Sequence, residues 1–496
     1  DGKGFSISNL KVKDADKYGS LFGLVSGTIK NVKFQNCSVE SSSNTPVGIV
    51  AGWAGNNNHT LGDVCVENVE AVNCVVKGGG GNTGGLFGST GWATIKNCKF
   101  QGTVEAAAGK CAGIMGQAYG DATSPVENCS VEATLKSEGR YIAGIMGQQS
   151  GAVDVKNCTF KGTIETKFDL AGGIIAWATE GLIENCVVEA DITVIKNASS
   201  NYAYVGGILG YTTSGKGLMT IRNCMYKGTL SAQGTCVAGI FGDITSPALI
   251  ENCAAMGTIN STQGYAAGIA AYVTKTGPAT IRNCYTNFVI NDAHSKGYSA
   301  NIAADISTNT VIENCYAKGK LNGGYGLGGI VGRASNITNM GGNNNQNYNI
   351  TVQKCITDVD VKSVSVYEKD GATYPGESPD SHYSIGAVVG YTGFLNVMAD
   401  CYRKADMEFF AYSSNYNGTG VDVSNHNELY DQENSGPETP LVQKWTDPVI
   451  DKFFCPYHGK AYTGAATAVA KTLGWDDTIW NLSGDTPMLA QYPDNK

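Results

Sequence analysis

The chain has 496 residues, of which 65 are glycine and only 16% are charged, and its formal net charge is −9. This acidic balance excludes the basic surface that nucleic-acid binding requires. No apolar run is long enough to cross a bilayer, so we expect no transmembrane segment in this chain.

The chain opens with the segment DGKGFSISNL (1–10), which already carries the pattern of the repeats that follow. We therefore expect the chain to be a fragment, or a mature product trimmed from a longer protein. Between residues 20 and 400 no helical period is sustained, whereas short β-branched stretches bounded by Gly, Asn, Ser or Thr recur throughout. That pattern predicts short strands joined by turns.

Two motifs alternate along this region. The first places a cysteine after a polar residue, which is Asn in ten of twelve copies: Cys37, Cys74, Cys98, Cys129, Cys158, Cys186, Cys224, Cys253, Cys284, Cys315, Cys355 and Cys401. The second is a Gly-Leu/Ile-x-Gly-like tetrapeptide, such as GLFG (85–88), and one copy precedes each of these cysteines. Repeats of about 30 residues that hold several short strands are typical of solenoids. The sequence predicts an all-β fold, a β-helix of about twelve coils over residues 1–402.

Residues 403–496 lack the repeat and include the alanine-rich stretch GAATAVAKTLG (464–474), which predicts a short helix. Because the open end of a solenoid must be covered, we expect this segment to be a C-terminal cap. Polar insertions at 55–63, 335–349 and 364–382 are expected to form loops that leave the coils.

The residue before each Asn-Cys pair carries alternating charge through eight consecutive repeats: Lys96, Glu127, Lys156, Glu184, Arg222, Glu251, Arg282 and Glu313. Like charges directly opposite one another on adjacent strands are destabilising. The alternation therefore predicts that equivalent positions of successive coils lie one above another, as exposed ion pairs.

Apolar residues flank the Asn-Cys pair at an odd separation, such as Val126 and Val131. A straight strand would place two such residues on opposite faces. A bend at Asn resolves this conflict, because Asn tolerates left-handed backbone, and stacked Asn amides can form a hydrogen-bonded ladder. We expect this ladder to be buried, although three of its asparagines are glycosylation sequons, and we expect the cysteines to be buried thiols without disulfides. Four cysteines outside the row remain undecided: Cys65, Cys111, Cys236 and Cys455.

A further row lies four residues after the start of each Gly-Leu/Ile-x-Gly-like motif: Ser89, Gln117, Gln148, Trp177, Tyr211, Asp243, Tyr272, Asp305, Arg333 and Tyr391. The first two copies have Leu24 and Gly52 there and do not fit. Within this strip we predict a ligand site of exposed rings and hydrogen-bonding groups suited to sugar faces: Trp177, Tyr211, Tyr272, Asp243 and Gln148. Two alternatives stay open, that the rings only shield a sheet edge, and that the row faces a second layer rather than solvent.

No convergent catalytic set is present, so a binding protein is favoured over an enzyme. The alternative is an enzyme, a polysaccharide lyase or glycosidase of β-helical fold, which would act through paired carboxylates. The histidines are scattered and expected to be exposed: His59, His294, His382, His426 and His458. Because there is no C-x-x-C or H-x-x-x-H spacing, no metal or other cofactor is expected.

The chain resembles the GLUG-motif proteins, a family of bacterial surface and secreted proteins. The resemblance rests on GLFG (85–88), SLFG (20–23), the Gly-Ile-x-Gly copies, the opening DGKGFSISNL and the ending WDDTIWNLSGDTPML (475–489). It implies display on a bacterial cell surface or secretion, as in gut anaerobes of the Bacteroidetes type. The implied function is that of an adhesin-like protein presenting its repeat surface to extracellular glycans or to host or partner proteins.

Overall fold

The computed structural model describes residues 1–13, 18–55, 64–119, 124–195, 203–213, 217–262, 264–274, 277–293, 297–324, 326–334, 348–363, 366–369, 372–375, 384–392, 397–412, 420–422 and 458–492. Within those ranges the only helix is α1 (Ala466–Thr472), and the other regular elements are β-strands. The fold is all-β, as predicted.

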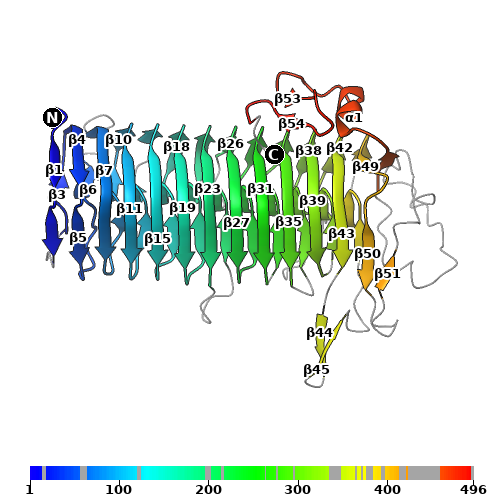
Figure 1. Ribbon diagram of the computed structural model, residues 1–496, viewed down its shortest axis with the longest axis horizontal. Helices are drawn as coiled ribbons and strands as arrows, with labels where there is room; N and C mark the ends of the chain where they lie inside the picture. The colour runs from blue at the N-terminus through cyan, green and yellow to red at the C-terminus, as the bar shows by residue number, and fades with distance from the viewer. Residues whose placement is uncertain are drawn as a thin grey trace. The chain divides into compact units, whose positions relative to one another are not determined.

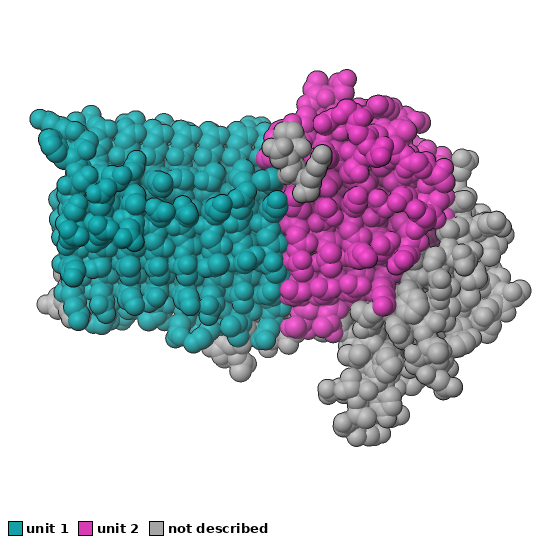
Figure 2. Space-filling model, in the orientation of Figure 1, with its two compact units in different colours: residues 1–234, 240–246 teal, residues 235–239, 247–496 magenta. Residues whose placement is uncertain are grey.

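The chain divides into two compact units, which Figure 2 shows in different colours. Unit 1 comprises residues 1–234 and 240–246, and unit 2 comprises residues 235–239 and 247–496. Both units are parallel β-solenoids, and the strands make about ten turns in all, which is close to the twelve predicted. Among the described residues, one sheet has twelve strands and another has ten, because the first strand of the latter lies in the third repeat.

Each complete coil contains four short strands. A pre-bend strand ends just before the Asn-Cys pair and a post-bend strand follows it, and both belong to sheet A. A three-residue strand of sheet C then leads through a tight turn, which contains the start of the Gly-Ile-x-Gly motif, into a strand of sheet B. Figure 1 shows the sheet A strands of unit 1 running side by side, from β1 in blue to β27 in green.

In unit 1 the first coils contribute β1 (Ser6–Ser8), β2 (Lys11–Lys13), β4 (Thr28–Gln35), β5 (Ser38–Ser41) and β7 (Val64–Gly78) to sheet A. The later pre-bend strands are β10 (Ala93–Lys96), β14 (Ser124–Glu127), β18 (Ala152–Lys156), β22 (Glu180–Glu184) and β26 (Met219–Arg222). The later post-bend strands are β11 (Lys99–Ala106), β15 (Ser130–Ser137), β19 (Thr159–Thr166), β23 (Val187–Val194) and β27 (Met225–Ala232). Sheet C has β8 (Thr83–Gly84), β12 (Lys110–Ala112), β16 (Tyr141–Ala143), β20 (Leu170–Gly172) and β24 (Tyr204–Gly206). Sheet B has β3 (Phe22–Val25), β6 (Ala51–Gly55), β9 (Phe87–Gly91), β13 (Met115–Tyr119), β17 (Met146–Ser150), β21 (Ile175–Ala178), β25 (Leu209–Thr212) and β29 (Phe241–Ile244).

Unit 2 repeats this layout. Its pre-bend strands are β30 (Ala248–Glu251), β34 (Ala279–Arg282), β38 (Thr310–Glu313), β42 (Ile350–Gln353) and β48 (Val397–Ala399). Its post-bend strands are β31 (Ala254–Ser261), β35 (Tyr285–Asp292), β39 (Tyr316–Gly323), β43 (Ile356–Ser363), β49 (Tyr402–Lys404) and β50 (Phe409–Tyr412). Sheet C has β28 (Cys236–Ala238), β32 (Tyr265–Ala267), β36 (Tyr298–Ala300), β40 (Gly326–Gly328) and β46 (Ser384–Gly386), and sheet B has β33 (Ala270–Thr274), β37 (Ala303–Ser307), β41 (Val331–Ala334) and β47 (Val389–Thr392). The remaining strands are β44 (Val366–Lys369), β45 (Ala372–Pro375), β51 (Gly420–Asp422), β52 (Lys460–Tyr462), β53 (Trp480–Asn481) and β54 (Met488–Leu489).

The alternating charges pair between coils, as the sequence predicts. Lys96 Nζ lies 3.0 Å from Glu127 Oε2, and Arg222 Nε lies 2.7 Å from Glu184 Oε1. Lys156 is aligned with glutamates on both sides. Its amine nevertheless contacts Asp154 Oδ1 at 2.9 Å, two residues earlier on its own strand. The register prediction is therefore confirmed. The pairing prediction holds for Lys96 with Glu127, Glu184 with Arg222, and Glu251 with Arg282. It does not hold for Lys156, or for Glu313, whose carboxylate accepts a hydrogen bond from Gln353 Nε2 at 2.8 Å.

The asparagine before each cysteine forms the predicted bend. Asn157 has a φ of 53°, in the left-handed region. Its Nδ2 donates to Asn128 Oδ1 at 3.0 Å, and Asn185 Nδ2 donates to Asn157 Oδ1 at 3.1 Å. Our expectation that this ladder is buried was wrong, because the side chains of Asn128, Asn157 and Asn185 are exposed. The bend turns the Asn side chain outward so that the following cysteine points inward.

The cysteine row forms a buried column. The thiols of Cys98, Cys129, Cys158 and Cys186 are at most 1% exposed, and burial helps to raise the pKa of the Cys186 thiol well above its usual value. None of the described cysteines forms a disulfide, and these include Cys65, Cys111 and Cys236, whereas Cys455 lies outside the described residues. Aliphatic and aromatic side chains such as Ile95 and Phe100 complete the core.

The C-terminal segment has the predicted short helix, α1, which packs near β43 in unit 2. The indole Nε1 of Trp475 donates to the Lys354 carbonyl at 3.2 Å. The boundary between a solenoid at 1–402 and a cap at 403–496 stays a prediction. Of the insertions, the third contains the antiparallel pair β44–β45, and most of the other two lies outside the described residues.

Candidate functional site

Four of the five residues predicted to bind ligand lie in register on adjacent strands of sheet B in unit 1. Gln148 on β17 is aligned with Trp177 on β21. Trp177 is aligned with Tyr211 on β25, and Tyr211 with Asp243 on β29. The fifth, Tyr272, lies on β33 of unit 2, where it is aligned with Asp305. The repeat therefore places these positions in straight rows within each unit.

The rings are less exposed than predicted. Trp177, Tyr211 and Tyr272 are half-buried, as is Gln148, and the Asp243 side chain is only 3% exposed. The reason is that the row faces a second layer, sheet C, which is one of the two alternatives that the sequence left open. Trp177 and Tyr211 pack on a small cluster formed by Ala143, Leu170 and Ala176.

Sheet C supplies a second row of aromatic residues that the sequence analysis missed. Tyr204 on β24 stacks on Tyr211, with ring centroids 4.8 Å apart and planes 14° apart. Tyr141 on β16 approaches Trp177 at 6.4 Å. The tight turn between the two sheets creates these contacts, since a Cβ added at Gly206 would collide with the Leu209 carbonyl oxygen.

A sequence signal for this second row exists. Each sheet C residue stands seven positions before its sheet B counterpart, as in Tyr204 and Tyr211 or Tyr265 and Tyr272. In unit 2 the rings of the latter pair stack at 4.9 Å. A search for residues recurring at a fixed offset from the strip would have found them.

Trp53 extends the unit 1 row toward the N-terminus. The spacing of the motif predicts Gly52 at this position, but the register aligns Trp53 with Leu24 on one side and Ser89 on the other. The half-buried Trp53 ring lies 5.3 Å from the Tyr119 ring, at a tilt of 38°. Unit 1 thus has aromatic groups at two places along one row, and the assignment of the second copy was wrong by one residue.

Amides and hydroxyls occupy the row between these two aromatic groups. Asn82 Nδ2 donates to Ser89 Oγ and to Gln117 Oε1, both at 2.9 Å. Tyr119 Oη donates to the same Gln117 oxygen at 2.8 Å. These bonds hold the polar side chains in one arrangement, so this part of the row is preorganised.

The charged groups near the rings differ in how they are compensated. Arg140 Nε lies 3.5 Å from Asp169 Oδ2, and its guanidinium lies 5.6 Å from the Tyr141 ring centroid. Burial, followed by the charge of Asp243, raises the pKa of Tyr211. By contrast, burial lowers the pKa of the Lys110 amine, which stands seven residues before Gln117.

The equivalent row of unit 2 contains a buried ion pair. Arg333 Nε donates to Asp305 Oδ1 at 2.8 Å, and the Asp305 side chain has no exposed surface. The same guanidinium lies over the Tyr298 ring at 4.1 Å and donates to its hydroxyl at 3.1 Å. Burial raises the pKa of Asp305, although the hydrogen bonds and charge of Arg333 oppose the shift.

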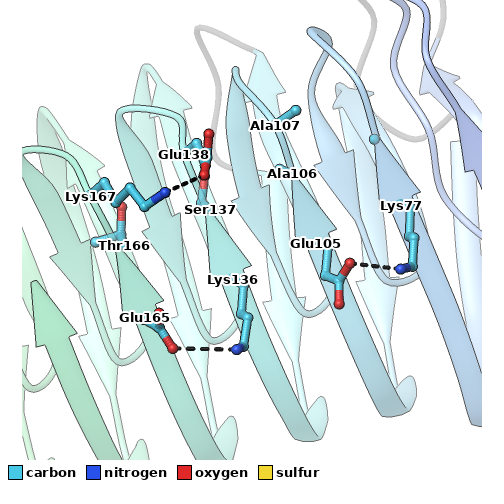
Figure 3. Close-up of a pocket in the computed structure, with 11 residues that line it drawn as sticks. Lys77, Glu105, Ala106, Ala107, Lys136, Ser137, Glu138, Glu165, Thr166 and Lys167 are labelled. Carbon is cyan, nitrogen blue, oxygen red and sulfur yellow. Dashed lines mark hydrogen bonds and ion pairs between the residues drawn. The ribbon is translucent and has the colours of Figure 1, made fainter. Parts of the chain in front are cut away.

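A separate groove of about 400 Å³ runs along the ends of the post-bend strands β7, β11, β15 and β19 in unit 1. Figure 3 shows that its charged side chains face one another in pairs. The pairs are Lys77 with Glu105 at 2.9 Å, Lys136 with Glu165 at 3.4 Å, and Lys167 with Glu138 at 2.5 Å. Because its charges neutralise each other, this groove offers little to a charged ligand.

Within the described residues, no three His, Cys, Asp or Glu side chains are grouped to hold a metal ion. His458 is 4% exposed rather than exposed as predicted, and its Nδ1 accepts a hydrogen bond from the Ala387 backbone N–H at 3.2 Å. The other four histidines lie outside the described residues. In the part of the chain that the structure describes, no helix is long and apolar enough to cross a membrane.

No protein-family model and no curated protein matches the chain. The resemblance to GLUG-motif proteins therefore rests on the motifs quoted above. Among solved structures, a Bacteroides ovatus protein named as a putative immunoglobulin A1 protease is similar, at 14% sequence identity. The match covers 79% of this chain and 86% of that chain, with a TM-score of 0.33. Similarity at this level carries no conclusion about function.

Proposed function

We propose that the protein is a bacterial adhesin-like binding protein, displayed on the cell surface or secreted, that binds extracellular glycans along the row between sheets B and C of unit 1. The observation that carries the proposal is the alignment of Trp177 and Tyr211 on consecutive strands, each beside an aromatic or amide group. Bacterial origin, surface display and secretion come from the resemblance to GLUG-motif proteins.

Several features support a binding role. The rings are half-buried and stacked, so their orientation is fixed before a ligand arrives, which lowers the cost of binding. Successive strands repeat at about 4.8 Å, so the row suits an extended chain better than a compact molecule. Aromatic faces with neighbouring hydrogen-bonding groups, here Gln148 and Tyr204, are suited to pyranose rings. A host or partner surface protein carrying such glycans would be recognised in the same way.

A polysaccharide-degrading enzyme is the alternative. Glycosidases require two carboxyl groups facing one scissile bond. In the described row of unit 1 the carboxylate aligned with the rings is Asp243, whereas Asp169 is paired with Arg140. This arrangement favours retention of a glycan over its cleavage.

The experiment is retention on a glycan panel, with the products analysed at the same time. We expect binding without release of reducing ends or unsaturated sugars. Trp177→Ala and Tyr211→Ala should each weaken retention about tenfold, as loss of a central aromatic contact does. The half-buried rings contribute to packing, so each variant should also lose about 1 kcal/mol of stability.

The conservative variants Trp177→Phe and Tyr211→Phe are the matched controls. They keep a ring in the row and should retain most of the binding. Retention that is unchanged in both alanine variants would show that the rings only shield the sheet edge. Product release by the wild-type protein would favour the enzyme.

A further inference from the structure

Lys110 differs from four other lysines of unit 1 in its surroundings. Lys77, Lys96, Lys136 and Lys167 each lie within 3.4 Å of a glutamate on a neighbouring coil or turn. Among the described residues, Lys110 has no carboxylate partner at such a distance, although it is half-buried. A half-buried amine that lacks a counter-charge is costly unless something else supplies the charge.

Burial is the sole cause of the change in its acidity. It lowers the pKa of Lys110, whereas the glutamate partners raise the pKa values of Lys77 and Lys167. The local environment thus disfavours the ammonium form of Lys110, and an incoming anion would reverse that effect.

The position of Lys110 connects it to the proposed glycan row. It begins β12 and is aligned with Tyr141 of the next coil, so both side chains lie on the same face of sheet C. Its sheet B counterpart, seven residues later, is Gln117, which accepts hydrogen bonds from Asn82 and Tyr119.

Gln117 stands at the middle of the row. Trp53 and Trp177 are four strand steps apart, with Ser89, Gln117 and Gln148 between them. Four steps correspond to about 19 Å. A linear chain that contacted both aromatic groups would therefore pass Lys110.

We propose that Lys110 is the recognition site for an anionic substituent, a carboxylate or sulfate, on a linear glycan that spans the row from Trp53 to Trp177. The inference rests on the proposed function and narrows it to acidic glycans. The ammonium donates charge-assisted hydrogen bonds to the anion, while the flanking rings and amides contact the sugar faces and hydroxyls.

The test compares oligosaccharides that differ only in charge. Oligogalacturonides and carrageenan oligomers carry carboxylates and sulfates, respectively, and their methyl-esterified and desulfated forms are the neutral counterparts. We expect the full chain to retain an acidic form more strongly than its neutral counterpart, and to lose that preference as salt is raised. Whichever series is retained, the carboxylated or the sulfated one, identifies the anion that Lys110 recognises.

Lys110→Met should weaken retention of the acidic form about tenfold and leave the neutral form unaffected. It should not lower the melting temperature, because it removes an amine whose charge is disfavoured by burial. Lys110→Arg keeps the charge and should keep the preference. Lys77→Met makes the same change of net charge outside the row and should leave the retention of both the acidic and the neutral form unchanged.

The outcomes separate the two proposals. Equal retention of acidic and neutral forms, unaltered by Lys110→Met, would overturn the acidic-glycan inference and leave the glycan-binding function standing. If no glycan of either kind is retained, both fail. Retention of poly-glutamate in preference to every glycan would overturn the inference in favour of an acidic protein partner.

Discussion

The rows between sheets B and C in the two units share one scaffold but use charge differently. In unit 2, Asp305 and Arg333 neutralise each other inside the fold, and Arg333 covers the face of Tyr298. In unit 1, Lys110 is half-buried with no described carboxylate beside it, and aromatic rings lie on both sides along the row. The repeat thus supplies the positions, and the substitutions within it decide whether a charge is paired inside the fold, as Arg333 is with Asp305, or lacks a described carboxylate partner, as Lys110 does.

The largest loss of stability is expected from a substitution in unit 2. Arg333→Met leaves the Asp305 carboxylate, which has no exposed surface, without its cation. Removal of one partner of a buried pair typically costs about 3–5 kcal/mol. Denaturant unfolding followed by circular dichroism would measure this loss, and Lys110→Met in unit 1 is the contrasting variant with no loss expected. Equal destabilisation by both would abolish the distinction between the rows.

The pH dependence provides a check on the same variant. The pKa of Asp305 is raised in the folded protein, so the folded state binds this proton more tightly than the unfolded state does. This group therefore lowers stability as pH rises from the usual carboxyl range through its raised pKa. Without Arg333 the pKa rises further, so the deficit of Arg333→Met should shrink on acidification toward pH 4. A deficit that stays constant with pH would mean that the charge of Asp305 is not its cause.

A smaller loss of stability, equal in the two units, is expected from substitutions at the asparagine bend, where both units have the same backbone conformation. Asn157 and Asn283 both have a φ of 53°, and each donates an amide hydrogen bond to the asparagine one coil before it. Replacement of either by alanine should cost about 2 kcal/mol, from left-handed strain and lost hydrogen bonds. Replacement by glycine should cost less, because glycine removes the strain. Clearly different losses for the two alanine variants in denaturant unfolding would show that the scaffolds are not equivalent.

The smallest effect concerns the charge row of sheet A. Glu184→Lys in unit 1 and Glu251→Lys in unit 2 each remove an ion pair with an arginine of the next coil. Because such pairs near the surface are weak, each variant should lose about 1 kcal/mol or less. Thermal melts at low and high salt would measure the loss, which should diminish as salt screens the repulsion. A loss as large as that of Arg333→Met would contradict the view that only the buried pair is structural.

The sequence was sufficient to predict the solenoid, because each coil repeats the same bend and each bend is marked by Asn-Cys. The alternation of charge from Lys96 to Glu313 also predicted the register, since a charge on one parallel strand interacts most strongly with the charge directly opposite it on the adjacent strand. Lys156 departs from the pairing because Asp154, on its own strand, competes for the amine. Such local competition is not visible in a row read one position per coil.

The candidate site was less predictable. The strip was found from its spacing, but the sheet that covers it comes from residues seven positions earlier, and the pairing depends on a tight turn at Gly206. Trp53 was missed because the motif was counted from its first glycine, whereas hydrogen bonding sets the register from the strand. Half-burial of Tyr211 follows from this second layer and could not be read from the strip alone.

The thiol column has a consequence for how the chain must be made. Cysteine oxidation and disulfide exchange proceed through the thiolate, and the folded coils hold Cys98, Cys129 and Cys158 away from solvent. Once closed, the coils shield these thiols from oxidants in the solvent. An unfolded chain, however, offers all sixteen cysteines of the sequence for wrong cross-links. In an oxidising compartment, coil closure and oxidation therefore compete in time, and the yield of native protein depends on which is faster.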